Sequence, residues 1–115
     1  MANISMLQQL TGYLELTNQR QELIVGNMAN IDTPGYHTKD LNFQGAMQDV
    51  VNGGSSKMES ASLEVEGLPE RPDGNNVNVD REGLLLSQTQ LQYQMGVQLI
   101  KAEFHKLLTA IKEGS

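Results

Sequence analysis

The sequence predicts a mainly α-helical protein in which long N- and C-terminal helices pack as a coiled-coil-like pair. A short, loop-rich middle segment with a small β element joins them. Apolar residues recur at alternating three- and four-residue steps near both ends of the chain, which is typical of paired helices. Between the ends this periodicity is lost. Only 38% of residues are hydrophobic and 4% aromatic, too few for a thick globular core.

This pattern divides the chain into three segments. Residues 1–35 form an N-terminal axial helix and a turn, residues 36–83 a variable, loop-rich middle segment, and residues 84–115 a C-terminal axial helix. In the middle segment, Val77 and Val79 alternate with polar residues and predict a short strand. Asp80 is then expected to cap the last helix, with Glu82 in its first turn.

The first helix is expected over residues 4–30. Ser5 and Gln8 have the spacing of a capping box, in which a hydroxyl and an amide satisfy backbone donors at the helix start. Pro34 and Gly35 end the helix region, because Pro disfavours helical backbone in the preceding residue and Pro-Gly suits the centre of a type II turn. The apolar positions that we expect to face neighbouring helices are Leu7, Leu10, Leu14, Ile24, Met28 and Ile31.

In the last helix, the stripe of apolar residues expected to face neighbouring helices, here called the seam, is more regular than in the first helix. Leu91, Met95 and Leu108 lie beside it and widen the apolar face beyond what one partner helix would cover, so more than one neighbour is expected. Burying the seam is worth on the order of 10–20 kcal/mol, whereas ordering such a helix costs about 30–60 kcal/mol. Helical hydrogen bonds recover only part of the difference, so assembly is expected to complete folding. The seam comprises Leu86, Tyr93, Val97, Ile100, Phe104, Leu107 and Ile111.

Composition argues against several classes of function. A formal net charge of −6 without a basic patch disfavours nucleic acid as a partner. The longest aliphatic run, residues 84–86, is far too short to span a membrane. The N-terminus lacks the basic and apolar regions of a secretory signal, so any export is expected to proceed without a cleaved signal peptide. With no Cys, neither a disulfide nor a thiolate metal site is available.

The sequence also offers no constellation for catalysis, and we expect a protein that is not an enzyme and has no cofactor. A calcium loop starting at Asn76 would need Gly and Glu where the chain has Arg81 and Ser87. His37 and His105 lack the spacing of paired metal ligands, and a packing or solvent-facing role is the default. The common nucleophile, phosphate-binding and dinucleotide-binding signatures are missing.

Two segments carry a resemblance to a known family. Residues 26–36 read GNMANIDTPGY, which resembles the signature that closes the first helix of flagellar rod and hook proteins. Residues 73–82 and 90–94 are similar to the entry of the C-terminal helix in the proximal rod branch of that family. The TPGY turn and the short centre favour this branch. The motif residues are Asn27, Ala29, Asn30, Thr33, Pro34, Gly35 and Tyr36.

The resemblance implies a structural subunit of the proximal rod in the flagellar basal body. Such subunits polymerise through their terminal helices into an axial tube that transmits torque. The implied partners are copies of itself, other flagellar rod proteins, the MS-ring with its rod-junction protein, and the flagellar type III export apparatus. The implied location is the rod in the periplasmic space. Another rod or hook subunit and a free-standing coiled-coil adaptor remain alternatives.

The resemblance also assigns roles to the motif. Asn27, Asn30 and Thr33 have short polar side chains that can bond free backbone groups where the first helix ends. Gly35 supplies the turn, which requires a positive φ, and Tyr36 is an amphipathic anchor.

Overall fold

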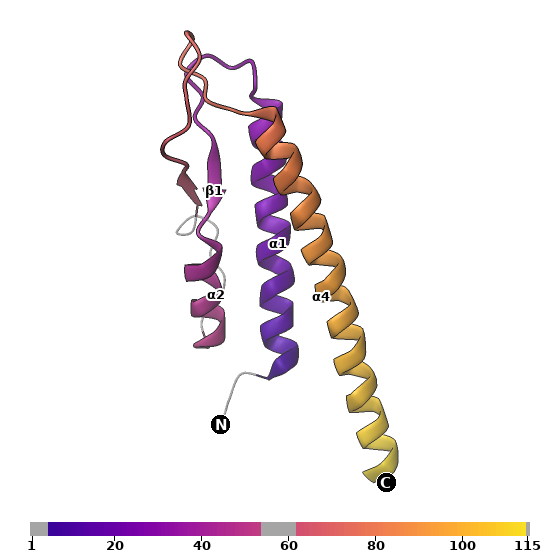
Figure 1. Ribbon diagram of the computed structural model, residues 1–115. Coiled ribbons are helices and arrows are strands. Elements are labelled where there is room, and N and C mark those ends of the chain that lie inside the picture. Colours follow the sequence, from indigo (N-terminus) through magenta and orange to yellow (C-terminus); the bar gives the residue numbers. More distant parts are fainter. Residues whose placement is uncertain (1–4, 54–61, 115) are drawn as a thin grey trace.

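Two long helices dominate the computed structural model, which describes residues 5–53 and 62–114 and measures 67 × 24 × 17 Å (Figure 1). Helix α1 spans Met6–Ala29 and helix α4 spans Val79–Gly114. Between them lie strand β1 (Lys39–Leu41), helix α2 (Phe43–Val51) and strand β2 (Ser62–Glu64). The predicted fold class is confirmed: long terminal helices pack together and are joined by a short middle segment with a small sheet.

The predicted start of the first helix is confirmed. Ser5 is the N-cap of α1: its side chain accepts from the Gln8 N–H at 3.1 Å, and the Gln8 side chain accepts from the Ser5 N–H at 3.1 Å. These two bonds satisfy backbone donors that the first helical turn leaves free.

Helices α1 and α4 run antiparallel from a common end, where Asn27 of α1 bonds to Glu82 of α4. Helix α1 has 24 residues and α4 has 36. At 1.5 Å per residue, α4 therefore extends beyond the start of α1 by about 18 Å. Figure 1 shows this overhang at the C-terminal end of α4.

The middle segment folds back along α1. Strands β1 and β2 pair antiparallel, with Asp40 opposite Leu63. Helix α2 then packs on α1, and a Cβ at Gly12 of α1 would lie only 2.5 Å from Val50 Cγ1, so the missing side chain permits this close approach. The small core made by these elements comprises the buried residues Leu16, Leu41, Ala46 and Val50.

Three local expectations were wrong. Residues 75–78 form no strand, and α4 already begins at Val79. Asp80 is not the N-cap, because the Asn78 side chain accepts from the Arg81 N–H at 3.1 Å. The middle segment contains a nine-residue helix, α2, where only loops were expected. The side chains of Asn76 and Asn75 accept hydrogen bonds from the N–H groups of Thr38 and Val77, and these bonds hold residues 75–78 instead of strand pairing. The alternation of apolar and polar residues in this segment therefore does not mark a strand.

Candidate functional site

The two segments that carry the family resemblance pack against each other at the end of the molecule where α1 stops and α4 starts. We call this region the motif junction; it comprises residues 27–39 and 71–82. The junction contains most of the buried polar side chains in the described part of the chain: Asn27, Thr38, Asn75, Asn76 and Glu82. Buried polar groups are tolerated where hydrogen bonds satisfy them, so this region specifies one arrangement of the chain.

The predicted turn is confirmed. Gly35 has a φ of 75°, and the Tyr36 N–H donates to the Thr33 carbonyl at 3.2 Å, as a type II turn with Pro34 and Gly35 at its centre requires. Before the turn, the Asn30 side chain donates to the Gly26 carbonyl at 2.8 Å, in addition to the Asn30 N–H at 3.1 Å. The Thr33 hydroxyl in turn donates to Asn30 Oδ1 at 3.0 Å. Helix α1 therefore ends by side-chain bonds within the motif.

Asn27 is the centre of the junction. Its Nδ2 donates to the Lys39 carbonyl at 2.8 Å and to Glu82 Oε1 at 2.9 Å. Its Oδ1 accepts from the Lys39 N–H and from the Tyr36 hydroxyl, both at 3.0 Å. All four hydrogen-bonding positions of this amide are used. Burial and, secondarily, the Glu82 carboxylate raise the pKa of Tyr36, which favours the protonated phenol that donates here.

Asn75 and Asn76 supply the second half of the junction. The Asn75 amide donates to the carbonyls of Asn30 and Thr33, at 2.9 and 2.8 Å, and so bridges the end of α1 and the turn. Asn76 Oδ1 accepts from the Thr38 N–H at 2.6 Å. Both side chains are buried. The segment leading into α4 is thus fixed to the segment leaving α1 by buried side-chain hydrogen bonds.

The backbones of the two segments also touch. The Gly35 N–H donates to the Asp73 carbonyl at 2.8 Å. Gly74 has a φ of 86°, and a Cβ there would lie 3.3 Å from the Cα of Gly35. Arg71 donates to the carbonyls of Val77 and Ile31. The junction therefore depends on two glycines, one in each segment, that approach each other closely.

Ion pairs between neighbouring charged side chains connect the junction to β1 and α1. Arg20 forms a bidentate pair with Asp40, at 3.0 and 2.9 Å, and Arg81 lies 3.7 Å from the same carboxylate. Arg81 also donates to Glu82 Oε2 at 2.7 Å. The buried Glu82 carboxylate is therefore compensated by Arg81 and the Asn27 amide, which a buried charge requires.

The predicted interface positions lie in two different environments. In α1, Leu7, Leu10, Leu14 and Met28 are half-buried and Ile24 is buried; Ile31, just beyond the end of α1, is half-buried as well. In α4, Leu86, Val97 and Ile100 are half-buried, whereas Tyr93, Phe104, Leu107 and Ile111 are exposed.

The face of α4 that is most deeply buried against α1 carries small side chains. Thr89 and Gly96 are buried, and a Cβ at Gly96 would lie 2.7 Å from Leu14 Cδ2. Most of the large apolar side chains of α4 are instead exposed. Leu91, Met95 and Leu99 line a shallow groove of about 380 Å³ on its outer face. Contacts with α1 therefore leave most of the apolar surface of α4 uncovered.

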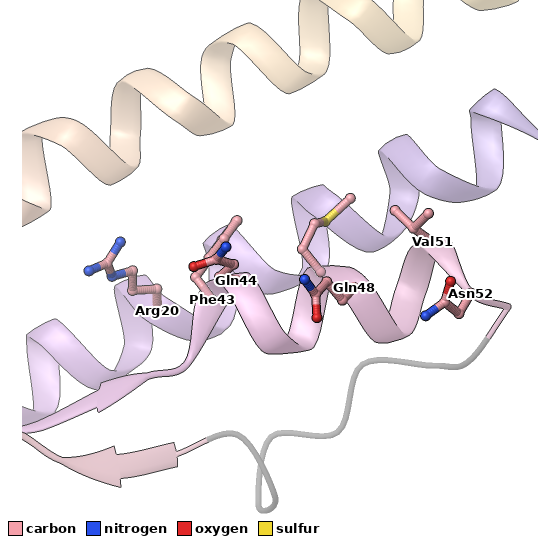
Figure 2. A pocket seen from close by; sticks show the side chains of 7 residues that line it. Arg20, Phe43, Gln44, Gln48, Val51 and Asn52 are labelled. Atoms are coloured by element: carbon pink, nitrogen blue, oxygen red, sulfur yellow. The ribbon is translucent and has the colours of Figure 1, made fainter.

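The structure has two further surfaces of note, an apolar ridge on α4 and a groove beside α2. We call the exposed apolar residues Phe104, Leu107, Leu108 and Ile111, on the overhanging end of α4, the C-terminal ridge. We call a groove of about 570 Å³ beside α2 the α2 groove; Figure 2 shows Arg20 at one end and Val51 and Asn52 at the other. The groove is lined by Arg20, Phe43, Gln44, Met47, Gln48, Val51 and Asn52.

The described residues include no group of three or more acidic, His or Cys side chains that could hold a metal ion. None of the helices in residues 5–53 and 62–114 is long and apolar enough to cross a membrane. The arrangement consists of a hydrogen-bonded polar junction and of apolar faces of α4 that α1 leaves exposed.

Comparison with known proteins identifies the relatives of this chain. No family model matches it. The flagellar basal body rod protein FlgB of Escherichia coli K12 is 28% identical over 89% of each chain. The FlgB proteins of Bacillus subtilis and Buchnera aphidicola are 29% and 28% identical, over 94% and 86% of this chain. The chain is a homologue of FlgB. It is a structural subunit of the flagellar basal body rod.

Two junction residues of this FlgB homologue, Glu82 and Asn75, are not predicted by the sequence pattern. Glu82 was expected to favour the helix start, yet it is buried against Asn27, which lies 55 positions away in the chain. Asn75 lies within residues 73–82, which carry the resemblance, but has no predicted role there. The available signal was the dense run of asparagines at 75, 76 and 78, since short polar side chains commonly bond nearby backbone. Of the motif residues, Ala29, Thr33, Pro34 and Gly35 are exposed.

Proposed function

We propose that this rod subunit polymerises through its terminal helices, with the uncovered faces of α4 as the main assembly surface. The observation that carries the proposal is the distribution of exposed apolar side chains. Of the 14 large hydrophobic residues exposed in the described part of the chain, ten lie on α4, among them Leu84 at 62% and Ile111 at 68%. Such a concentration on one helix of an isolated subunit is typical of an interaction surface.

These exposed residues lie on more than one side of α4. Leu84, Leu91 and Met95 are spaced by seven and four positions and so share one stripe of the helix. Tyr93, Phe104 and Ile111 follow steps of eleven and seven and share another. Two apolar stripes require two neighbours. Heterologous contacts of this kind generate an open helical assembly when the rotation does not close, which is the geometry of an axial tube.

The proposed location, partners and export route are those that the family resemblance implies. The subunit belongs to the proximal rod and contacts other rod proteins, the MS-ring with its rod-junction protein, and copies of itself. It leaves the cytoplasm through the flagellar type III export apparatus without signal cleavage and works in the periplasmic space. There the assembled helices transmit torque, and we assign the subunit no catalytic step, cofactor or nucleic-acid partner. Residues 1–35, 36–83 and 84–115 serve as axial helix with turn, variable segment and axial helix.

The test is to place a carboxylate on the outer face of α4. Leu91→Asp and Leu99→Asp alter residues that are 59% and 51% exposed, so the isolated subunit should fold normally. Burying an unpaired carboxylate in an assembled contact costs several kcal/mol per subunit. Cells carrying either variant should export the protein yet build few basal bodies and not swim. Gln90→Asp, at an exposed polar position of the same helix, is the matched control.

Normal swimming of both leucine variants would refute the assignment of this face. A discrete dimer or tetramer of the wild-type protein in light scattering, with no higher assembly, would instead favour a free-standing coiled-coil adaptor.

Hydrogen exchange provides an independent test on the unmodified protein. The overhang of α4 has exposed side chains at nearly every position from 104 to 114. An isolated helix end of this kind is marginally stable, so its amides should exchange rapidly in the dilute monomer and slowly in the rod. Strong protection of residues 104–114 in the monomer would contradict completion of folding by assembly.

A further inference from the structure

We propose that the side chain of Tyr13 couples the position of α2 to the direction of α4, so that the packing of the middle segment sets where the C-terminal ridge points. The coupling is a property of the single subunit. Its consequence for assembly rests on the proposed function, in which the exposed faces of α4 meet neighbouring subunits.

The contact of Tyr13 with α2 is aromatic. The centroids of the Tyr13 and Phe43 rings lie 5.7 Å apart, and the ring planes are inclined by 85°. This edge-to-face arrangement is favourable for two aromatic side chains. Phe43 is the first residue of α2 and packs against the small core. A shift of α2 therefore acts directly on the Tyr13 ring.

The same ring touches α4. A Cβ at Gly96 would lie 3.1 Å from Tyr13 Cδ2 and 3.2 Å from Tyr13 Cε2. Gly96 is buried, and it has no side chain that could change rotamer and absorb a displacement of the ring. Closely packed contacts of this kind transmit strain from one element to the next.

Tyr13 lies between two neighbours in α1 that help to define this contact. Gly12 faces Val50 of α2, and Leu14 faces Gly96 of α4. Helices α2 and α4 lie on different sides of α1 (Figure 1). A side chain that reaches both helices can therefore couple them without any movement of the α1 backbone.

The position of Gly96 along α4 amplifies a displacement. The start of α4 is held at Glu82 by the bond from Asn27, at 2.9 Å. Along the helix, Gly96 lies about 21 Å from Glu82, and Gly114 lies about 48 Å from it. For a rigid helix that pivots at the junction, a shift of about 1 Å at Gly96 becomes about 2 Å near the C-terminus. The C-terminal ridge lies on this far part of α4.

Phe43 gives the coupling a connection to the surface. It lines the α2 groove as well as touching Tyr13. A displacement of this wall of the groove therefore reaches the backbone of α4 through a single aromatic ring.

A double-mutant cycle on the purified full chain tests the coupling. Gly96→Ala pushes a methyl group against Tyr13, and Phe43→Leu removes the ring on the other side, so that Tyr13 can yield. In urea denaturation, Gly96→Ala multiplies the unfolding equilibrium constant of its parent by some factor. This factor should be at least about threefold larger in the wild-type background than in the Phe43→Leu background. The helix propensity of Ala contributes equally to both and cancels.

Equal factors in the two backgrounds would overturn the proposal. Val51→Ala, at the other end of α2, is the matched control for Phe43→Leu, and it should leave the factor unchanged within about twofold. Tyr13→Phe keeps the ring and should keep the threefold difference, whereas Tyr13→Leu should abolish it. A difference that persists in Tyr13→Leu would place the coupling in the α1 backbone and would also overturn the proposal.

The direction of α4 can be measured separately on the folded subunit. The chain contains no Cys, so Asn18→Cys and Leu108→Cys, both at exposed positions, can carry a pair of spin labels. Gly96→Ala should change the mean distance between the labels by about 2 Å. The change should be less than half as large when Phe43→Leu is also present. Equal changes in both backgrounds would contradict control of α4 by the packing of α2.

The inference and the proposed function fail separately. If the factors and the label distances are independent of Phe43, the coupling is wrong, whether or not the chain enters a rod. If both depend on Phe43 but the chain does not enter a rod, the proposed function fails and the coupling stands as a property of the subunit.

Discussion

The Asn27 amide donates a 2.9 Å hydrogen bond to the Glu82 carboxylate, and both side chains are buried. This bond joins the last turn of α1 to the first turn of α4. It fixes the end from which the two axial helices diverge, so the positions of both assembly surfaces depend on it.

Asn27→Asp should be among the most damaging single-atom changes in the chain. It places a second carboxylate beside Glu82 and removes the amide that donates to it, so an uncompensated charge is buried. The free energy of unfolding should fall by about 3–5 kcal/mol, as measured by urea denaturation of the purified subunit. The same change at exposed Asn18 should alter stability by less than about 0.5 kcal/mol. Equal effects at the two positions would contradict the role of the buried bond.

Gly35→Val should disrupt the turn that Gly35→Asn tolerates. No atom lies within 4 Å of a Cβ built at Gly35, so the cost comes from its φ of 75° alone. A β-branched residue is strained there by about 1–3 kcal/mol, whereas Asn enters this region more readily. Basal-body yield and motility at matched expression should be low for Val and near normal for Asn. Wild-type behaviour of both variants would show that the turn needs no special backbone geometry.

Gly74→Asn should be worse than Gly35→Asn, although the φ of Gly74, 86°, is similar. A Cβ at Gly74 would lie 3.3 Å from the backbone of Gly35, which cannot move without disturbing the turn. The thermal midpoint of Gly74→Asn should therefore be the lower of the two. Equal midpoints would mean that the two segments can separate without loss.

Gly83 and Gly96 both lie in α4 but should respond oppositely to larger side chains. A Cβ at Gly83 meets nothing within 4 Å, so Gly83→Ala should gain about 1 kcal/mol from helix propensity. Gly96→Leu should lose about 1–3 kcal/mol by forcing α4 away from Tyr13 and Leu14. Chemical denaturation of both variants checks this. Stabilisation by Gly96→Leu would show that α1 and α4 are not in close contact.

His37 should make stability depend on pH. A hydrogen bond to Glu64, together with the charge of Glu70, raises the pKa of His37 above its ordinary value of 6.5. Because the folded-state pKa is the higher one, the contribution is fully present below about pH 6.5 and is lost as pH rises through the folded-state value. The wild-type protein should therefore lose stability relative to His37→Gln between pH 6 and pH 8. An unchanged difference across this range would exclude the ion pairs in solution.

The features that the sequence by itself determined are local ones. The capping box of Ser5 and Gln8, the type II turn at Gly35 and the two periodic helices all depend on residues within a few positions of each other. Their energies are set by backbone geometry and nearby hydrogen bonds, and the printed residues are enough to predict them. The resemblance at residues 26–36 pointed to the family in the same way.

Only the tertiary structure decided how distant segments use these elements. Leu16 is buried outside the predicted seam, because α1 packs on α2 as well as on α4. The face of α4 that meets α1 most closely is marked by Thr89 and Gly96, since close approach requires small side chains there, and most of the large apolar side chains of α4 stay exposed. The Asn27–Glu82 bond spans 55 positions. These contacts depend on how separate elements pack against each other. The periodicity of apolar residues along one helix does not show which of its faces a neighbouring element will cover.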